Sequence, residues 1–590
     1  MKLLKQKKSK FDNITNILFE TQEKKKLLKL IFLMLIGMTL ELFGVGLIFP
    51  ALKLLTDTEF LSKTYNFLNI DELDTKMLLL SIVSIFIIFF GFKNLFLWIV
   101  LKKYSSFLAQ YEANLQFRLF KGYLNKSVAY FKEKNSSNII INIKEISSFF
   151  SAVYLNSLLN LSLEIILQTS ILFLLFYFSW QSTLIIFILF GSLSIAIFSY
   201  NKKKLEYLGK LRNELSQSQL LNVQQGIGGI KEIKLLGREA FFLNNFEKNT
   251  NTLADANIKN AIISGSPKLI IEFFAVCSVS VIIFLFLFLG KSLTEILPIL
   301  GLFLVAAYKM VPSFNKILLM LNRIKFSTDM VDKIIKLANE YNLDKLNKIK
   351  NEKLEKISFK KEIVLKDIFF KYPNRQNTVL ENINVLIKKN SFIGISGESG
   401  SGKSTLIDII MGIVKPDKGS IEVDGFSIND SIKDWQKQLG YVSQNIYLLP
   451  DTIKNNIAFG IPEDQIDDDL VNEVIKKTSL KKFVDSLEFG INTFIGEGGA
   501  LISGGQKQRI GIARALYNQP KILIFDEATN ALDLDIEKQI LNEISLLKNE
   551  FTLIFITHKE SSIKYCDQKY LINNKNISKI NKCVFCSHFS

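Results

Sequence analysis

The stretch Gly397-Glu398-Ser399-Gly400-Ser401-Gly402-Lys403-Ser404-Thr405 fits the pattern G-x-x-x-x-G-K-[ST], in which a glycine-rich loop binds phosphate. An apolar run, Ser391–Ser396, precedes it and suits a buried strand, and Leu406–Met411 after it begin a predicted helix. The glycines let successive backbone N–H groups face one anion, the helix adds its positive N-terminal end, and Lys403 brings a charge to the outer phosphates. The order of strand, loop and helix therefore predicts a nucleotide-binding site.

The composition divides the chain into two regions of different character. Its 590 residues leave room for two or more domains. The apolar residues crowd into blocks before residue 320, whereas the rest is typical of a soluble α/β domain. The formal net charge of +17 could indicate a nucleic-acid partner, but the lysines gather beside the apolar blocks. That distribution is typical of the cytoplasmic side of a membrane protein, so we expect no nucleic-acid partner.

Six apolar blocks are each near the roughly 20 residues needed to cross a bilayer. The predicted spans are Leu30–Leu54, Met77–Leu101, Tyr154–Phe178, Thr183–Tyr200, Leu269–Gly290 and Ile296–Phe314. Between them, the segments 102–153 and 201–268 have a polar–apolar rhythm that suits long helices extending the spans into the cytoplasm. Ahead of the first span, residues 11–29 favour either an amphipathic helix on the inner membrane surface or a solvated lead-in.

Charged residues outside the spans predict the orientation. Lysines flank one end of three spans, namely Lys24, Lys25, Lys26, Lys29, Lys102, Lys103, Lys202, Lys203 and Lys204. The stretch between the first two spans is acidic, and the other outer turns are very short. The positive-inside rule therefore predicts that both termini lie in the cytoplasm. The lysine-rich N-terminus has no early apolar core, so we expect no cleavable signal peptide.

Charges also lie within or at the ends of the spans, where each costs about 2.5–3.5 kcal/mol on insertion scales. One explanation is a basic lining for an anionic substrate, formed by Lys93, Lys268, Lys309 and Lys316. The alternative is that lysines near span ends extend their ammonium groups to the interface, and that Lys268 pairs with Glu272 one helical turn away. The alternative explains Lys316 well, Lys268 fairly and Lys93 poorly.

The four cysteines are scattered and imply no disulfide framework. They are Cys277, Cys566, Cys583 and Cys586. The last two lie near His588 and hint at a metal site, but no second ligand pair accompanies them. Two free thiols on a C-terminal tail are the favoured interpretation.

Further motifs accompany the phosphate loop: Tyr372 before Pro373, Tyr441–Asn445, Ile502–Arg509, Ile522–Glu527 and Ile554–His558. With the six spans and long inner loops ahead of them, they resemble ABC exporters. The resemblance covers most of the chain beyond the connector. It implies a membrane α-helical domain with six transmembrane helices and long cytoplasmic extensions, followed by an α/β P-loop ABC ATPase domain that binds ATP and Mg²⁺. The expected domains are a transmembrane domain at 1–327, a linker at 328–362, the ATPase domain at 363–580 and a tail at 581–590.

The resemblance assigns roles to three of these residues. Tyr372 would stack on adenine, Gln444 would reach Mg²⁺ and the attacking water, and His558 would contact the γ-phosphate. In an isolated position none of these residues would be informative. Their order around the phosphate loop is what matches the family.

The run Ile522–Glu527 is an apolar strand that ends in two carboxylates, and its composition fits a parallel sheet covered on both faces. In the family, Asp526 would hold Mg²⁺ through water beside the hydroxyl of Ser404, and Glu527 would polarise the attacking water. Downstream, Ala531-Leu532-Asp533 resembles the D-loop, so Asp533 joins the expected ATP site.

The run Ile502–Arg509 resembles the ABC signature, with isoleucine in place of the usual leucine. Its Ser503, Gly504, Gly505 and Gln506 would face the γ-phosphate of ATP bound on the opposite subunit, where a helix N-terminus favours negative charge. One chain with one such domain therefore implies a dimer. A homodimer is expected, because Glu527, His558 and the signature all look competent.

The cargo is suggested by a narrower resemblance. Glu41–Pro50, Tyr65–Ile70 and Tyr308–Lys316 resemble segments of the bacterial flippase of lipid-linked oligosaccharides used in protein N-glycosylation. That resemblance implies ATP-driven transfer of a polyprenyl-pyrophosphate-linked oligosaccharide from the cytoplasmic to the outer leaflet of a bacterial inner membrane. Where that family carries arginines facing the pyrophosphate, this chain offers lysines, which keep the charge but lose the bidentate fork.

Three alternatives remain open. A lipid A-type flippase would share nearly every motif and would also carry an anionic lipid. A peptide or drug exporter is disfavoured, because the sequence shows no N-terminal Cys/His peptidase module and a basic cavity suits cationic drugs poorly. A regulatory or channel-like ABC protein that binds ATP without pumping is disfavoured by the intact Glu527 and His558.

Overall fold

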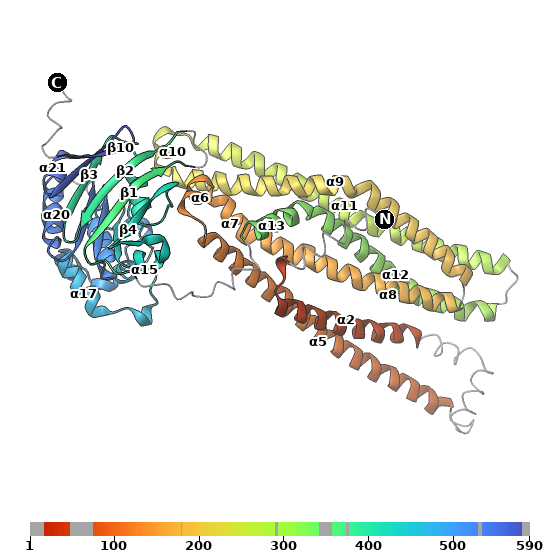
Figure 1. The fold of residues 1–590 in the computed structure, drawn as a ribbon. Coiled ribbons are helices and arrows are strands. Elements are labelled where there is room, and N and C mark those ends of the chain that lie inside the picture. Colours follow the sequence, from red (N-terminus) through yellow and green to blue (C-terminus); the bar gives the residue numbers. More distant parts are fainter. Residues whose placement is uncertain are drawn as a thin grey trace. The chain divides into compact units, whose positions relative to one another are not determined.

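The computed structural model describes residues 17–47, 75–178, 180–288, 293–341, 357–372, 377–528 and 534–580 (Figure 1). The chain divides into two compact units. The first contains residues up to 349 apart from 127–129, and the second contains those three residues and the chain from 350 onward. Each unit has its own buried apolar clusters, so each is described by itself.

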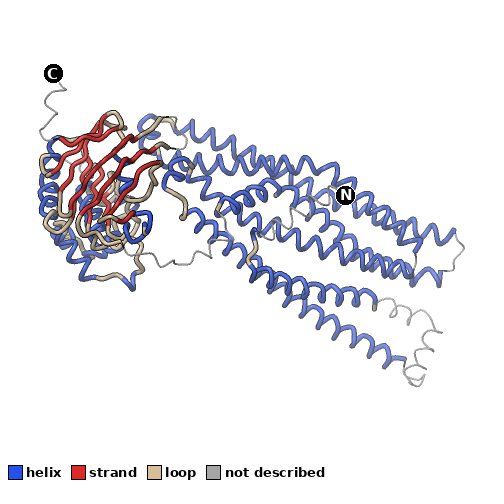
Figure 2. The backbone as a smooth tube through the Cα atoms, viewed as in Figure 1, coloured by secondary structure: helices blue, strands red, loops and turns tan. Residues whose placement is uncertain are grey.

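The described residues of the first unit are mainly helical (Figure 2). The α-helices are α2 (Thr21–Gly46), α5 (Thr75–Leu124), α6 (Val128–Glu133), α7 (Ser136–Ile141), α8 (Asn156–Phe178), α9 (Trp180–Gly228), α10 (Ile230–Leu236), α11 (Glu239–Phe288), α12 (Leu293–Phe326) and α13 (Thr328–Glu340). Two π-helical segments, Asn142–Ile146 and Phe149–Leu155, lie between α7 and α8.

Four segments in the described part of the chain are long and apolar enough to cross a membrane. They are Thr21–Gly44, Val83–Leu124, Ser136–Tyr177 and Glu239–Cys277, which overlap the first, second, third and fifth predicted spans. The fourth and sixth predicted spans lie inside the continuous helices α9 and α12. The predicted extensions are confirmed, because α5 and α9 continue well beyond their apolar parts and α11 begins far ahead of its own.

The described residues just ahead of α2 pack against α5. Leu18 and Phe19 are buried. Arg118 of α5 donates a hydrogen bond from Nη1 to the carbonyl oxygen of Leu18, 2.9 Å away, and its guanidinium lies 3.6 Å from the carboxylate of Glu23. This arrangement pairs a buried arginine and ties the chain to α5 before α2 begins.

Helix α13 occupies the first part of the predicted connector. Its apolar residues Met330, Val331, Ile334 and Ala338 recur at helical spacing and are all buried. They join the apolar cluster that contains Tyr111 of α5. This stretch therefore packs with the helical unit, because its apolar face needs a partner.

The second unit contains two sheets. The antiparallel one has the order β2-β1-β4-β5, and the mainly parallel one has the order β10-β9-β3-β8-β7-β6. The strands are β1 (Glu362–Phe370), β2 (Leu380–Lys388), β3 (Phe392–Gly397), β4 (Lys418–Val423), β5 (Phe426–Ser427), β6 (Leu439–Val442), β7 (Ile522–Asp526), β8 (Thr552–Ile556), β9 (Gln568–Asn573) and β10 (Asn576–Ile580). The α-helices are α14 (Lys403–Ile410), α15 (Ile432–Gln436), α16 (Ile453–Ile457), α17 (Asp468–Lys477), α18 (Lys481–Asp485), α19 (Gly504–Tyr517), α20 (Leu534–Leu547) and α21 (Glu560–Ile563).

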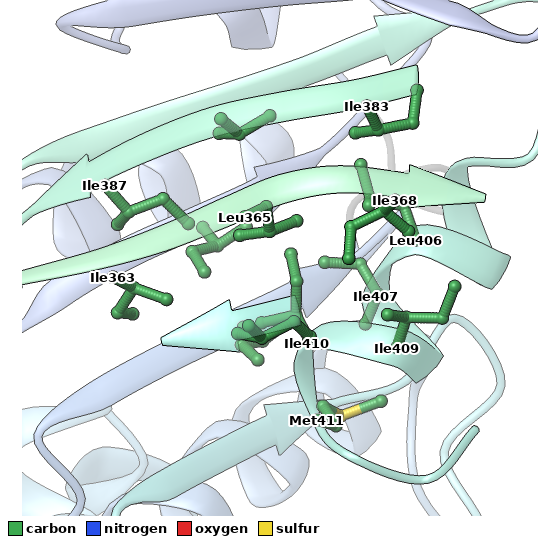
Figure 3. Close-up of a cluster of buried hydrophobic side chains, with 14 of the residues drawn as sticks. Ile363, Leu365, Ile368, Ile383, Ile387, Leu406, Ile407, Ile409, Ile410 and Met411 are labelled. Carbon is green, nitrogen blue, oxygen red and sulfur yellow. The ribbon is translucent and has the colours of Figure 1, made fainter. Parts of the chain in front are cut away.

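Apolar clusters cover both faces of the parallel sheet. Every residue of β3, β7 and β8 is buried, as expected for central parallel strands. Figure 3 shows one cluster, in which side chains of β1 and β2 face those of α14. The labelled residues are Ile363, Leu365, Ile368, Ile383, Ile387, Leu406, Ile407, Ile409, Ile410 and Met411. The helix that follows the phosphate loop is thereby held between the two sheets.

The close approach of α9 to α12 gives a stability prediction. A Cβ added to Gly209 would overlap the carbonyl oxygen of Phe326, a backbone atom that cannot turn away. We expect Gly209→Ala to destabilise the protein by about 1–3 kcal/mol, seen as a lower thermal unfolding temperature in detergent. Gly226→Ala on the same helix is the control. Nothing lies within 4 Å of its added Cβ, so it should unfold at the same temperature or higher. Equal stability of Gly209→Ala and the parent would contradict this helix contact.

Candidate functional site

The neighbouring parallel strands β3, β8, β7 and β6 end together on one side of the larger sheet. Ile395 of β3 pairs with Ile556 of β8, which also pairs with Asp526 of β7. On the far side of β7, Phe525 pairs with Val442 of β6. Because parallel strands in this register finish together, the loops after them converge at their carboxyl ends, where ligands bind in open α/β sheets.

The phosphate loop curls from β3 into α14. Gly400 and Gly402 have φ of +82° and +102°, values that favour glycine. A Cβ on Gly400 would meet nothing within 4 Å, so the loop opens onto free space there. The Oγ of Ser401 is buried without a hydrogen-bond partner in the described residues. A bound phosphate would satisfy it, so the loop fits the polyphosphate that the sequence predicts.

Lys403 lies buried at the first turn of α14. Its Nζ donates hydrogen bonds to the carbonyl oxygens of Gly397 and Glu398, at 2.8 and 2.9 Å. Burial lowers the pKa of the Lys403 ammonium, and the nearby Glu527 and Asp526 carboxylates oppose that shift. The loop thus holds the ammonium in place beside the open space that a phosphate would fill.

Glu527 lies at the centre of the converging loops. Gln444 donates from Nε2 to its Oε2, 2.9 Å away, and the Nδ1 of His558 lies 3.6 Å from its Oε1. The Nζ of Lys403 lies 4.0 Å from the same Oε1. Glu527 has φ of +48°, and its N–H donates to the carbonyl of Ile556 at 3.1 Å. The sheet therefore holds this glutamate in a rarely populated conformation, a feature that gathers at functional sites.

Asp526, the preceding residue, is 9% exposed. Burial raises the pKa of its carboxyl group. The hydroxyl of Tyr441 donates a hydrogen bond to Oδ2 at 3.3 Å. No role for Tyr441 follows from the sequence alone. In the sequence, Tyr441 is marked only by its position three residues ahead of Gln444. Its contact with Asp526 arises because β6 pairs with β7.

The residues predicted to hold Mg²⁺ supply the right donors. Ser404 contributes a hydroxyl, Gln444 an amide oxygen and Asp526 a carboxylate, and Mg²⁺ prefers such oxygens together with substrate phosphates. No cluster of three or more His, Cys, Asp or Glu residues that could hold a metal occurs among the described residues. The ion would therefore depend on these few oxygens and on the nucleotide.

A hollow of about 640 Å³ lies beside the phosphate loop. It is lined by residues 377–379, 398–401 and 572–575. The last group belongs to β9 and the turn into β10, and sequence reasoning missed it. It reaches the loop because Ile572 of β9 pairs with Gly397, a contact between distant residues with no local signal.

Tyr372 follows β1. Its ring lies edge-on to Phe370, with centroids 4.9 Å apart, and its hydroxyl lies 3.2 Å from the Thr405 hydroxyl. The structure thus places the predicted adenine-stacking residue against the helix that follows the phosphate loop.

The signature residues stand at the start of α19. Ser503 is the N-cap, and it forms a capping box with Gln506, in which each side chain accepts a hydrogen bond from the other's backbone N–H. Ser503 and Gly504 are exposed and Gly505 is half-buried. The helix contacts α16, α17 and β6. An exposed N-terminus fits the prediction that it meets a nucleotide on another subunit. Asp533 lies outside the described residues.

The four candidate substrate lysines lie on three helices. Lys93 of α5 is 5% exposed, and its Nζ lies 4.5 Å from the centre of the Phe90 ring. Lys268 of α11 pairs with Glu272 at 3.8 Å, as the alternative explanation predicts. Lys316 of α12 pairs with Glu164 of α8 at 2.9 Å. Lys309 also lies on α12, but the structure does not describe its side chain.

Comparisons with known proteins agree on the domain composition. Residues 13–303 match the family described as "ABC transporter transmembrane region", and residues 380–530 match "ABC transporter". A solved structure described as a bacterial Atm1-family ABC exporter with ATP bound has a TM-score of 0.74, with 19% identity and 94% of each chain covered. At that identity the likeness shows the fold alone.

Curated relatives cover most of the chain. The ATP-dependent lipid A-core flippase of Wigglesworthia glossinidia brevipalpis is 28% identical over 484 residues, 79% of each chain. The proteins of the same name from Vibrio parahaemolyticus and Salmonella typhimurium are 28% and 27% identical, with 77% and 78% of each chain covered. These matches and the two family matches establish an ATPase coupled to transport that uses ATP with Mg²⁺.

The surroundings of Glu527 predict the effect of removing its charge. Glutamine keeps the size of the side chain but cannot accept a proton, so we expect Glu527→Gln to lower ATP turnover about a hundredfold to ten-thousandfold. Nucleotide binding should persist, because Lys403 and the loop amides are unchanged. Turnover and binding of a fluorescent ATP analogue measure the two effects, with Glu497→Gln as a control. Turnover near the parent's would contradict the assignment.

The buried Asp526 gives a second prediction. The pKa of the Asp526 carboxyl group is higher in the folded state than in the unfolded state. As the pH rises between these two pKa values, the unfolded state loses its proton first, so the free energy of unfolding falls. At neutral pH the carboxylate therefore opposes folding. Asp526→Asn should raise the unfolding temperature of the nucleotide-free protein and abolish further stabilisation by ATP with Mg²⁺. The exposed Asp485→Asn is the control and should change neither. A lower unfolding temperature for Asp526→Asn would refute this reasoning.

Proposed function

Because this chain is an ABC exporter half-transporter, with a membrane-spanning region and an ATPase domain on one polypeptide, we propose that it is an ATP-driven lipid flippase. Its cargo is an anionic lipid of the lipid A type, moved from the cytoplasmic to the outer leaflet of a bacterial inner membrane. The observation that carries the cargo is the similarity, over more than three quarters of the chain, to proteins named ATP-dependent lipid A-core flippase.

The converging loops suit the hydrolysis of ATP. Glu527 accepts a proton from the attacking water, and Gln444, which already contacts its carboxylate, orients that water. Lys403 exchanges its loop carbonyl partners for phosphate oxygens, and His558 approaches the γ-phosphate. Ser404, Gln444 and Asp526 would hold Mg²⁺, which would neutralise charge on the phosphates.

The protein acts as a homodimer in this proposal. The exposed start of α19 presents Ser503 and the backbone N–H groups of Gly504 and Gly505 to a nucleotide held by the partner's phosphate loop. A 14-residue helix supplies a positive end for the γ-phosphate. Each chain then contributes one phosphate loop and one signature, so two ATP molecules are bound between two copies.

Charges within the membrane helices support an anionic cargo only in part. Lys93 is a buried cation in a span, which is costly and typical of a functional position. Lys316 and Lys268 already have acidic partners, so they contribute less net positive charge. Lys93, as a buried cation within a predicted span, is the member of the predicted set that we favour for contacts with lipid phosphates, and Lys309 stays a prediction from the sequence.

A lipid-linked oligosaccharide is the second candidate cargo. It is favoured by the resemblance of Glu41–Pro50 and Tyr308–Lys316 to the oligosaccharide flippase. Both cargos combine phosphate with lipid chains and could use the same lysines. They differ in their sugars, which these residues do not distinguish.

The cargo can be tested in proteoliposomes that contain either a lipid A-type lipid or a polyprenyl-pyrophosphate oligosaccharide. We expect ATP to drive transfer of the lipid A-type lipid between leaflets, and the Glu527→Gln protein to show none. Transfer of the oligosaccharide alone would replace the proposed cargo with the second candidate. ATP hydrolysis without transfer of either lipid would refute both.

A further inference from the structure

A groove of about 780 Å³ lies between α2 and α5. Two lysines from each helix line it, Lys26 and Lys29 of α2 and Lys102 and Lys103 of α5. All four are exposed, and no carboxylate lines the groove in the part of the chain that the structure describes. We call this feature the lysine groove. Its charge favours an anionic occupant.

The two helices run antiparallel, which orders the groove along its length. A Cβ on Gly37 of α2 would lie 3.0 Å from Leu97 of α5, and one on Gly44 would lie 3.5 Å from Phe89 and Phe90. Moving forward along α2 therefore means moving backward along α5. The lysines at the start of α2 lie level with those that follow the apolar part of α5.

Apolar side chains continue the groove on its membrane side. Phe32 and Leu33 of α2 and Trp98 and Ile99 of α5 also line it, and Phe32 and Trp98 are 65% and 59% exposed. The Nζ of Lys102 lies 5.8 Å from the centre of the Trp98 ring. A tryptophan beside lysines at the end of an apolar segment is typical of the level of lipid headgroups.

We propose that the lysine groove binds an anionic phospholipid of the cytoplasmic leaflet. The headgroup phosphate lies among the four lysines, and the acyl chains run along Phe32, Leu33 and Trp98. A soluble acidic ligand would match the lysines but would leave the apolar half unfilled. An amphiphile with a phosphate at the boundary matches both halves. The proposal is independent of the cargo, since the groove lies between the first two predicted spans and includes none of the candidate substrate lysines.

Trp98 provides a direct probe. The chain has three tryptophans. Trp435 is buried in the second unit, where its Nε1 donates to the carbonyl of Ile410. In a Trp180→Phe background, quenching by lipids with brominated acyl chains therefore reports on Trp98. The protein is placed in nanodiscs with a rising fraction of brominated phosphatidylglycerol in phosphatidylcholine, or the reverse.

We expect half-maximal quenching at a fraction of phosphatidylglycerol at least about threefold lower than that of phosphatidylcholine. Lys29→Gln, Lys102→Gln and Lys103→Gln together should bring this ratio close to one. The matched control changes Lys202, Lys203 and Lys204 to glutamine, which removes the same charge beside the fourth predicted span. It should retain the preference.

The proposal would be overturned by no preference in the parent, by an unchanged preference in the groove variant, or by an equal loss in the control. Absence of quenching by either lipid would also overturn it, because protein would then cover the groove. If the triple variant does not fold, Lys102→Gln alone should show an intermediate ratio, and an unchanged ratio would count against the proposal.

Discussion

The parallel register of β3, β8, β7 and β6 is the constraint on which the site depends. Of these strands, β3, β8 and β7 are wholly buried, and all four pair over residues that are distant in the sequence. Their common end brings Lys403, Gln444 and His558 within contact of the Glu527 carboxylate. A one-residue slip of a strand would turn its side chains to the opposite face, so the register is strongly selected by burial. Chemistry at the edge thus follows from packing in the core.

Opposite charges and polar donors then stabilise that carboxylate. Glu527 is held in a strained backbone conformation by its N–H bond to Ile556 and is surrounded by nitrogen atoms of three side chains. The Lys403 ammonium donates hydrogen bonds to two loop carbonyl oxygens and also lies near the carboxylate of Glu527. A polyphosphate would bring more negative charge to the same ammonium. The loop is therefore suited to an anion, to which the Lys403 ammonium would form new hydrogen bonds.

In the helical unit, polar groups within the predicted spans follow a different rule, because no bulk water is available to solvate them. Glu164 of α8 receives hydrogen bonds from both Ser313 and Lys316 of α12, and Gln168 donates to the carbonyl of Met310. These contacts join α8 to α12 at one level. Lys316, a candidate for substrate binding, thus also forms an ion pair that joins two helices.

The sequence by itself determined the features that are local. The phosphate loop, the carboxylates Asp526 and Glu527 and the histidine His558 each follow or end a short apolar run, and the long helices follow from apolar blocks and their rhythm. Tertiary structure decided the rest. The contact of Tyr441 with Asp526, the β9–β10 wall of the hollow and the partner of Glu164 depend on which strands and helices are neighbours. Such pairings join distant residues through the burial of whole faces, and a local pattern of residues does not specify which face meets which.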